Sequence, residues 1–467
     1  MFGVGWCAQL LDEMRKLVAA ARSVHPTAIL AIAGALALIY AFPGYMNWDS
    51  ADQLLQARNG VYTDWHAPVM AWYWHWIELV WTGPLPMLVL QLALFSWGLY
   101  GLARRRFTPR VAAVIASAVL LFPPVLAVMA VVWKDAQMAA WLVAGAMLVL
   151  RPSWRARVLG LVMLALAAAV RDNGAAALPP LLLLGVASWL PRRPLAVCAV
   201  AFGLFVGLSG TAILANRAIT DVHDHAWSRA NAIHDIAGTI CLSPPMTDDA
   251  VRAEITGIPL LPGDGPLQAR LCAIYSPRRW FTLSFDSRAM FEALPSDDDR
   301  AARRDAWFRV ISDHPGAFLR HRAKVMFELL GLGAEPVEEP VCQTFAGQPR
   351  QLVAVHHDAQ RSFLQRHVGK KFGRLAKTIL FRPWAYLLVG LILLGYAIVK
   401  KQWLIVAVIT SGVLYEASFA LGAAGPPYRY SHWLVTCVCV AAAIIAIQRG
   451  SRSEDGADPA PRRADLA

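Results

Sequence analysis

The apolar stretch "LAVCAVAFGLFVGLSGTAILA" at residues 195–215 indicates the fold class, because it carries no charged side chain. It is long enough to cross the ~30 Å hydrocarbon layer of a bilayer as one helix. Of the 467 residues, 57% are hydrophobic and 16% are charged, and the mean hydropathy is +0.44. We therefore predict an all-α polytopic membrane protein with about ten transmembrane helices and a large extracytoplasmic insert. The expected spans are 27–43, 84–103, 110–131, 136–150, 158–170, 175–190, 195–215, 384–399, 403–422 and 433–447.

The distribution of the net charge of +12 along the chain indicates the membrane topology, and it does not indicate binding to nucleic acid. Basic residues lie in short clusters at every second connection between apolar runs, which is the pattern of the positive-inside rule. This pattern predicts a multi-pass membrane protein with both termini in the cytoplasm. The clusters are Arg15, Lys16 and Arg22; Arg104 to Arg106; Arg151, Arg155 and Arg157; Arg192 and Arg193; Lys400 and Lys401; Arg449 and Arg452.

The remaining connections face the extracytoplasmic side and carry nearly all the unusual polar residues. They are 44–83, 133–135, 171–174, 216–383 and 425–432. A transporter is expected to place ionisable residues near the membrane midplane, often in an inverted repeat. We find no such repeat, and this one-sided distribution favours chemistry at the outer surface. The expected organisation is a transmembrane module 1–215, an extracytoplasmic insert 216–383, C-terminal transmembrane helices 384–447 and a disordered cytoplasmic tail 448–467.

The insert has the mixed composition of a globular segment. Its stretch 304–333 predicts two amphipathic helices separated at Pro315, because proline interrupts a helix. We expect these helices to lie on the membrane with Arg320, Arg322 and Lys324 near the headgroups. The alternative is a helix pair packed on a small domain of its own.

Cysteine and histidine residues of the insert raise two further possibilities. A disulfide between Cys241 and Cys272 is expected outside the cytoplasm, with Cys342 left over. Cys437 and Cys439 of the last span are expected in the core. The segment "TDVHDHAWSRANAIHD" (220–235) suggests either a metal site or a solvated loop, and the absence of an i, i+4 histidine pair favours the loop.

The stretch 46–76 crowds acids and aromatic rings at the outer end of the first span. Asp49 or Ser50 could simply cap a short helix. However, Lys134–Asp135, Arg171–Asp172–Asn173 and Tyr428–Arg429–Tyr430 also lie at outer ends of spans. A carboxylate can deprotonate an attacking hydroxyl while fixed cations stabilise a phosphate leaving group. The tryptophans and tyrosines suit interface anchoring or stacking on sugars, and 67–81 is expected to form a helix along the membrane.

These features together resemble the GT-C superfamily of integral-membrane glycosyltransferases. The chain is similar to uncharacterised bacterial members and to the protein mannosyltransferase and aminoarabinose transferase type. The resemblance follows nearly the whole chain in order. The motifs that carry it are "WDSADQ" (48–53), "DWHAP" (64–68), "WKD" (133–135), "RDNG" (171–174), "HDIAG" (234–238), "HPGAFLRHR" (314–322) and "RYSHW" (429–433).

The resemblance implies roles for individual residues. Asp49 takes the place of the family's first-loop acid and is the expected base, with Asp52 as the alternative. Asp135 is the expected second acid. The donor phosphate would be held by Arg171, Arg429, Lys134 and Arg322, and the substrate would contact His66, Asp64, Trp65, Asn173 and Tyr430.

The expected function is transfer of a sugar from a polyprenyl-phosphate donor to an acceptor hydroxyl of a glycan, lipid or protein. Transfer would occur on the extracytoplasmic face by an inverting single displacement, in cell-envelope polysaccharide biosynthesis. A divalent cation (Mg or Mn) is a possible cofactor, membrane lipid is a partner, and nucleic acid is not. The alternatives are a polysaccharide or lipid transporter, a lipid-linked glycan ligase or polymerase, and a non-catalytic scaffold.

Overall fold

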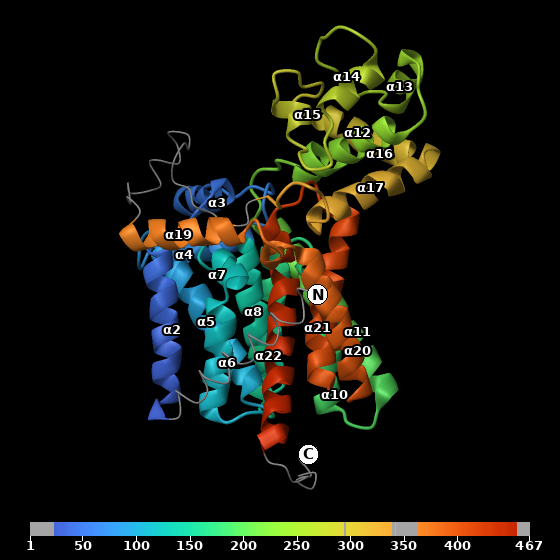
Figure 1. Ribbon diagram of the computed structural model, residues 1–467. Helices are drawn as coiled ribbons and strands as arrows, with labels where there is room; N and C mark the ends of the chain where they lie inside the picture. Colours follow the sequence, from blue (N-terminus) through green and yellow to red (C-terminus); the bar gives the residue numbers. More distant parts are fainter. Residues whose placement is uncertain (1–22, 294–295, 339–340, 342–361, 455–467) are drawn as a thin grey trace.

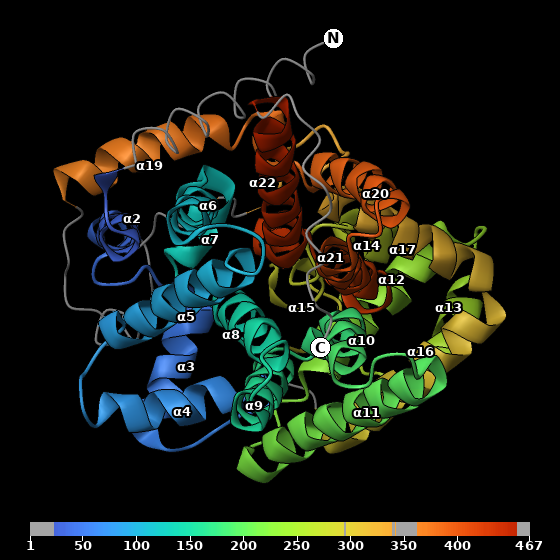
Figure 2. The ribbon, with the colours of Figure 1, turned by 90° about the horizontal axis from the view of Figure 1, so that it is seen from below.

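The computed structural model describes residues 23–293, 296–338, 341 and 362–454, and within them it is helical throughout, with isolated β-bridges but no strand. Upright helices form a bundle (Figures 1 and 2). They are α2 (Pro26–Ala41), α5 (Leu85–Ala103), α6 (Pro109–Leu121), α7 (Pro123–Met129), α8 (Lys134–Val149), α9 (Trp154–Val170), η2 (Gly174–Ala177) with α10 (Leu178–Trp189), α11 (Pro194–Ile219), α20 (Pro383–Val399), α21 (Trp403–Gly422), and η5 (Tyr428–Ser431) with α22 (His432–Glu454).

Several of these helices are long and apolar enough to cross a membrane, which indicates that the protein is membrane-associated. Four of the described helical segments meet this criterion: α5, α11, α21 and Tyr428–Gln448. The bent pair α6–α7 makes a fifth if it counts as one span, and α2, Gly174–Trp189 and α20 are shorter apolar helices. Each of the ten expected spans coincides with a helix or a helix pair.

The expected span 110–131 is broken. Its two parts, α6 and α7, meet at an angle of 72°. The break occurs at Phe122, which precedes Pro123 and adopts an extended backbone (φ −62°, ψ 124°). A proline disfavours helical geometry in the residue before it, so "FPP" ends one helix and starts another. The last helix also differs from expectation, because α22 continues to Glu454 instead of ending near 447.

Beyond one end of the bundle lies an outer domain with a separate hydrophobic core, which includes Ile236, Leu271, Phe291 and Val310 (Figure 1). The Cys241–Cys272 disulfide is confirmed and joins α12 to α14. Cys342 lies outside the described residues. The domain's helices are η3 (Trp227–Ala232), α12 (Ile233–Leu242), α13 (Asp248–Glu254), α14 (Leu267–Ile274), α15 (Thr282–Phe285), α16 (Asp297–Asp313) and α17 (Pro315–Leu329).

The predicted interruption at Pro315 is confirmed, but the placement of Arg322 near lipid headgroups is wrong. Both α16 and α17 pack on α12. Arg322 is buried, and its guanidinium donates to Asp235 Oδ2 at 2.8 Å and to the carbonyl of Ala423 at 2.6 Å. A Cβ atom added to Gly238 would collide with the ring of His321, so a glycine is needed for α12 and α17 to approach this closely.

Three helices lie across the end of the bundle that faces the outer domain: α3 (Trp48–Asn59), α4 (Val69–Glu78) and α19 (Phe363–Leu375) (Figures 1 and 2). A helix along the surface was expected at 67–81, and α4 occupies this segment. Its Trp72 and Trp76 are exposed, whereas Trp74 is fully buried. Exposed tryptophans beside a bundle of apolar helices are typical of the membrane interface.

Candidate active site

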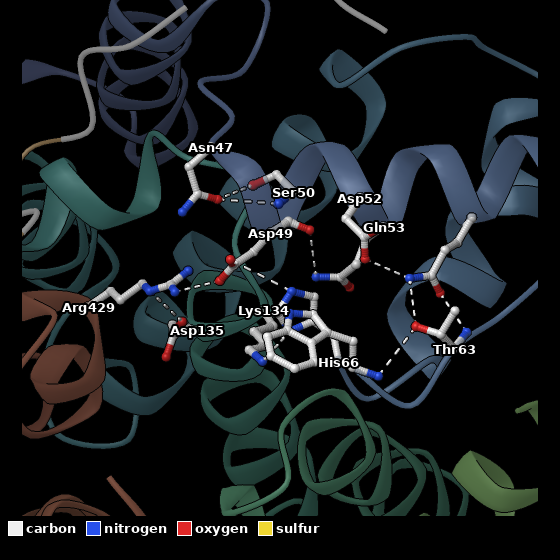
Figure 3. A network of polar contacts seen from close by, with 12 residues as sticks. Asn47, Asp49, Ser50, Asp52, Gln53, Thr63, His66, Lys134, Asp135 and Arg429 are labelled. Carbon is white, nitrogen blue, oxygen red and sulfur yellow. Dashed lines mark hydrogen bonds and ion pairs between the residues drawn. The ribbon is translucent and has the colours of Figure 1, made fainter. Parts of the chain in front are cut away.

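Asp49 does not cap α3, contrary to the alternative left open by the sequence. The cap is Asn47, whose Oδ1 accepts the backbone N–H of Ser50 at 3.2 Å. Asp49 stands in the first turn of the helix, and its Oδ2 lies 2.5 Å from an amino nitrogen of Arg429 (Figure 3). Because Asn47 supplies the cap, the Asp49 carboxylate is available for interactions across the bundle end.

A short backbone bridge joins the first outer loop to the segment before α8. Tyr45 N–H donates to the carbonyl of Ala130 at 3.2 Å, and Val132 N–H donates to the carbonyl of Tyr45 at 2.9 Å. The buried Gln91 also donates its side-chain amide to the carbonyls of Met129 and Val131, at 2.8 and 2.9 Å. These bonds satisfy backbone groups that have no helical partner where α7 ends. They also set the distance between the segments that carry Asp49 and Asp135.

Asp135 lies between two arginines at the start of α8. Its Oδ1 is 3.0 Å from an amino nitrogen of Arg171, and its Oδ2 is 4.0 Å from Nε of Arg429. Asp135 is fully buried, and Arg171 and Arg429 are only 5% and 6% exposed. A buried charge is tolerated when an opposite charge is paired with it. The ion pairs link four residues from distant segments into one cluster: Asp49, Asp135, Arg171 and Arg429.

Aromatic rings hold both guanidinium groups. Arg171 lies 4.4 Å from the ring centre of Tyr430, which stacks on Phe419 with centres 4.8 Å apart. Arg429 lies 5.0 Å from the ring centre of Trp133. Rings attract a cation through their faces and leave its N–H edges available for hydrogen bonds. This arrangement suits arginines that take up an anionic group at those edges.

The expected substrate residue Asn173 fixes Arg171 from the other side. Its Oδ1 accepts Nε of Arg171 at 3.2 Å, and its amide donates to Ser418 Oγ at 2.8 Å. The contacts therefore assign Asn173 a role in orienting the arginine.

Lys134 and His66 complete the cluster beside Asp49. Lys134 Nζ lies 3.0 Å from His66 Nδ1. An ammonium group only donates, so Nδ1 accepts and the ring proton sits on Nε2, 3.7 Å from Asp49 Oδ1. Burial, with the charge of Lys134, lowers the pKa of His66 to about 3. The imidazole is therefore neutral and directs an N–H toward the Asp49 carboxylate.

The two acids of α3 have opposite electrostatics. Burial raises the pKa of Asp49, but the charges of Arg429 and Lys134 outweigh burial, and the pKa falls well below its usual range. Burial raises the pKa of Asp52 to about 6, although Gln56 donates to its Oδ2 at 2.7 Å. Adjacent carboxyl groups with separated pKa values are typical of acid–base sites. Asp49 is the permanent anion and Asp52 the group that titrates near neutrality.

Three expected site residues lie away from this cluster. Asp64 Oδ1 accepts the backbone N–H of His225 at 2.8 Å, which ties the first outer loop to the insert. Trp65 packs between the guanidinium of Arg229 and the ring of Trp280. Arg322 binds Asp235 and the end of α21, as described above. Their contacts connect the outer domain to the rest of the protein.

The structure adds two residues that the sequence interpretation did not single out. Tyr415 is buried and interacts electrostatically with Arg171. It lies on α21, the helix that also carries Phe419. Glu416 is 2% exposed inside α21, and its Oε1 accepts the hydroxyl of Ser431 at 2.8 Å. Glu416 had a sequence signal, since a lone acid in an apolar run is a functional candidate by default. Tyr415 had none, because its position follows from the packing of α21.

Several acids and histidines of the described residues make contacts within the protein. No group of three or more His, Cys, Asp or Glu side chains there is arranged to hold a metal. Asp49 and Asp135 are each paired with an arginine instead. The histidines of 220–235 serve other contacts, such as His223 with Asp64 and His234 with the carbonyl of Ser276.

The chain matches no protein-family model, no curated protein and no solved structure.

Proposed function

We propose that this protein is a membrane glycosyltransferase that moves a sugar from a polyprenyl-phosphate donor to an acceptor hydroxyl on the extracytoplasmic face. One observation carries the proposal. Three cations, the buried Arg171 and Arg429 and the partly buried Lys134, gather around Asp49 and Asp135 at the outer-domain end of an apolar bundle. Figure 3 shows Arg429 and Lys134 beside Asp49. Two buried arginines suit a phosphate anion, which arginine can bind with two parallel hydrogen bonds, while the lipid tail of the donor stays in the membrane.

The two arginines have different duties in this mechanism. Arg171 is held by Asp135, Asn173 and Tyr430, so it is a fixed binding group. Arg429 has Asp49 as its nearest acid and Asp135 at 4.0 Å. A donor phosphate competes with Asp49 for the guanidinium. Binding of the donor thus weakens the attraction of Arg429 for Asp49 and raises the basicity of Asp49 when a base is required.

The chemical step is a single displacement with inversion. The Asp49 carboxylate takes the proton of the acceptor hydroxyl, and the oxygen forms a bond to the anomeric carbon. The bond from that carbon to the phosphate oxygen breaks, and its electron pair leaves with polyprenyl phosphate. Arg171 and Arg429 stabilise the charge that develops on the leaving group. Asp52, which titrates near neutrality, lies in the next turn of α3 and is the alternative proton acceptor.

The test is transfer from labelled undecaprenyl-phosphate hexose to acceptors in cell-envelope extracts, using the full-length protein in proteoliposomes. We expect release of undecaprenyl phosphate with a labelled covalent product, and loss of both with Arg171→Ala. Flux of the labelled lipid across sealed vesicles without a covalent product would favour a transporter instead. Wild-type rates in Asp49→Asn would remove Asp49 as the base.

The orientation belongs to the same proposal. The basic clusters between spans predict termini in the cytoplasm of a bacterial inner membrane, and about ten helices would then cross it. Accessibility labelling of single cysteines in the outer domain and at the opposite bundle end tests this orientation in intact cells.

A further inference from the structure

A second feature of the bundle end is independent of the transferase proposal. Helix α19 (Phe363–Leu375) lies across the end of α2, far from α19 in sequence (Figure 1). Gln365 donates its side-chain amide to the carbonyl of Phe42, the C-terminal cap of α2, at 2.5 Å. The ring of Phe372 lies 5.3 Å from that of Tyr40, in the last turn of α2. These contacts fix α19 at the level where α2 ends.

That level is a membrane boundary. The side of α2 that faces away from the bundle exposes Ile32, Leu36 and Ile39, each more than half accessible. Large aliphatic side chains exposed along an apolar helix face lipid tails. A helix that crosses the end of α2 therefore sits at headgroup depth.

The sequence of α19 divides its surface into two opposite faces. The buried residues Gln365, Gly369, Phe372 and Ala376 recur at helical spacing and form the face toward the bundle. On the other side, Arg366, Lys370 and Arg374 recur every four residues, and Lys371 adjoins them. All four cations are exposed, and residues 362–382 contain no acidic residue.

The apolar side chains of this segment also indicate a bilayer. Phe363 is 77% exposed and Ile379 is 60% exposed, although both are large hydrophobic residues. Exposed cations and exposed apolar side chains on a helix at headgroup depth together suit the surface of an anionic membrane. A soluble acidic partner would account for the cations but leave these apolar groups in water.

We infer that α19 and the turn that follows it form a binding surface for anionic phospholipid headgroups, with Lys370, Lys371 and Arg374 on the phosphates and Phe363 and Ile379 in contact with the lipid. This surface would keep a layer of anionic lipid beside α2 and the first outer loop. It uses none of the residues of the charged cluster, so its failure and that of the proposed transferase are separable.

Native mass spectrometry of the full-length protein tests the inference. The protein is exchanged into detergent that contains equal amounts of phosphatidylglycerol and phosphatidylcholine, and the bound lipids are counted. We expect the wild type to retain phosphatidylglycerol preferentially. Lys370→Glu/Lys371→Glu should reduce this preference by at least about fivefold, the effect of roughly one interfacial cation. The matched control Arg252→Glu/Arg304→Glu makes the same charge change on exposed residues of α13 and α16, and should keep the preference.

Three results would overturn the inference. The first is an unchanged preference for phosphatidylglycerol in Lys370→Glu/Lys371→Glu. The second is an equal loss of this preference in the control variant, which would show that net charge alone causes the effect. The third is retention of undecaprenyl phosphate with phosphatidylglycerol bound no better than phosphatidylcholine. Lys370→Gln/Lys371→Gln, with its melting temperature measured beside the wild type, provides a milder change if the double glutamate variant does not fold.

Discussion

Asp49→Asn should strengthen binding of the donor phosphate and slow sugar transfer. In the substrate-free protein, the Asp49 carboxylate lies 2.5 Å from a nitrogen of Arg429. A phosphate on the other edge of that guanidinium would lie roughly 5–6 Å from the carboxylate, from two hydrogen-bond lengths and the guanidinium width. Like charges at this separation repel by about 3 kcal/mol at an effective dielectric constant near 20.

Solvent reduces this repulsion, because the Asp49 side chain is 20% exposed. Taking about half of it leaves about 1.4 kcal/mol, which corresponds to a roughly tenfold change in affinity. We therefore expect Asp49→Asn to bind polyprenyl phosphate about tenfold more tightly than the wild type. Sugar transfer should fall by roughly a hundredfold or more, since the base is lost.

Calorimetric titration of the detergent-solubilised protein with a short-chain polyprenyl phosphate measures the affinity, and single-turnover transfer measures the rate. The matched control is Glu78→Gln, which removes a carboxylate from an ion pair with Arg58 at 2.6 Å, outside the cluster. The control should leave both values unchanged. Unchanged or weaker binding in Asp49→Asn would refute the competition between Asp49 and the donor phosphate for Arg429.

Three further predictions follow from the buried polar contacts. Asp52→Asn should stabilise the protein by about 2–3 kcal/mol at pH 8, because a carboxyl group with a raised pKa destabilises the folded state above about pH 6. This gain in stability should shrink toward zero at pH 4, and melting temperatures measured across that pH range test it. Arg322→Ala should cost about 3 kcal/mol by leaving Asp235 buried without its cation, whereas Arg320→Ala should cost little, and thermal unfolding compares them. Gln91→Leu should lower kcat with little change in KM, because it removes the hydrogen bonds to two backbone carbonyls beside the segment that carries Asp135. An altered KM with an unchanged kcat would contradict this role.

The positions of the helices were accessible from the sequence because length and apolar character are local properties of a segment. The ten expected spans all coincide with helices, and Pro315 separates α16 from α17 as predicted. The disulfide was also predictable, since Cys241 and Cys272 are the insert's close cysteine pair. The break at Phe122 had a local signal in "FPP", but a continuous apolar run concealed it.

The site was predictable in part, as a set of residue types at the outer ends of spans. The grouping of Asp49, Asp135, Arg171 and Arg429 agrees with that expectation, whereas Arg322, Asp64 and Trp65 make their contacts elsewhere. A motif shows which groups a segment carries. It does not show which way a side chain points after the helices pack.

The sequence by itself determined a bundle of apolar helices, the interruption at Pro315 and the end at which charged residues collect. Only the tertiary structure decided that Asn47 caps α3, that Asp49 therefore faces Arg429, and that Arg322 binds Asp235. The physical reason is the range of each interaction. Burial of an apolar run is specified within one segment, but a buried ion pair forms only where packing brings distant segments together and removes water from both charges.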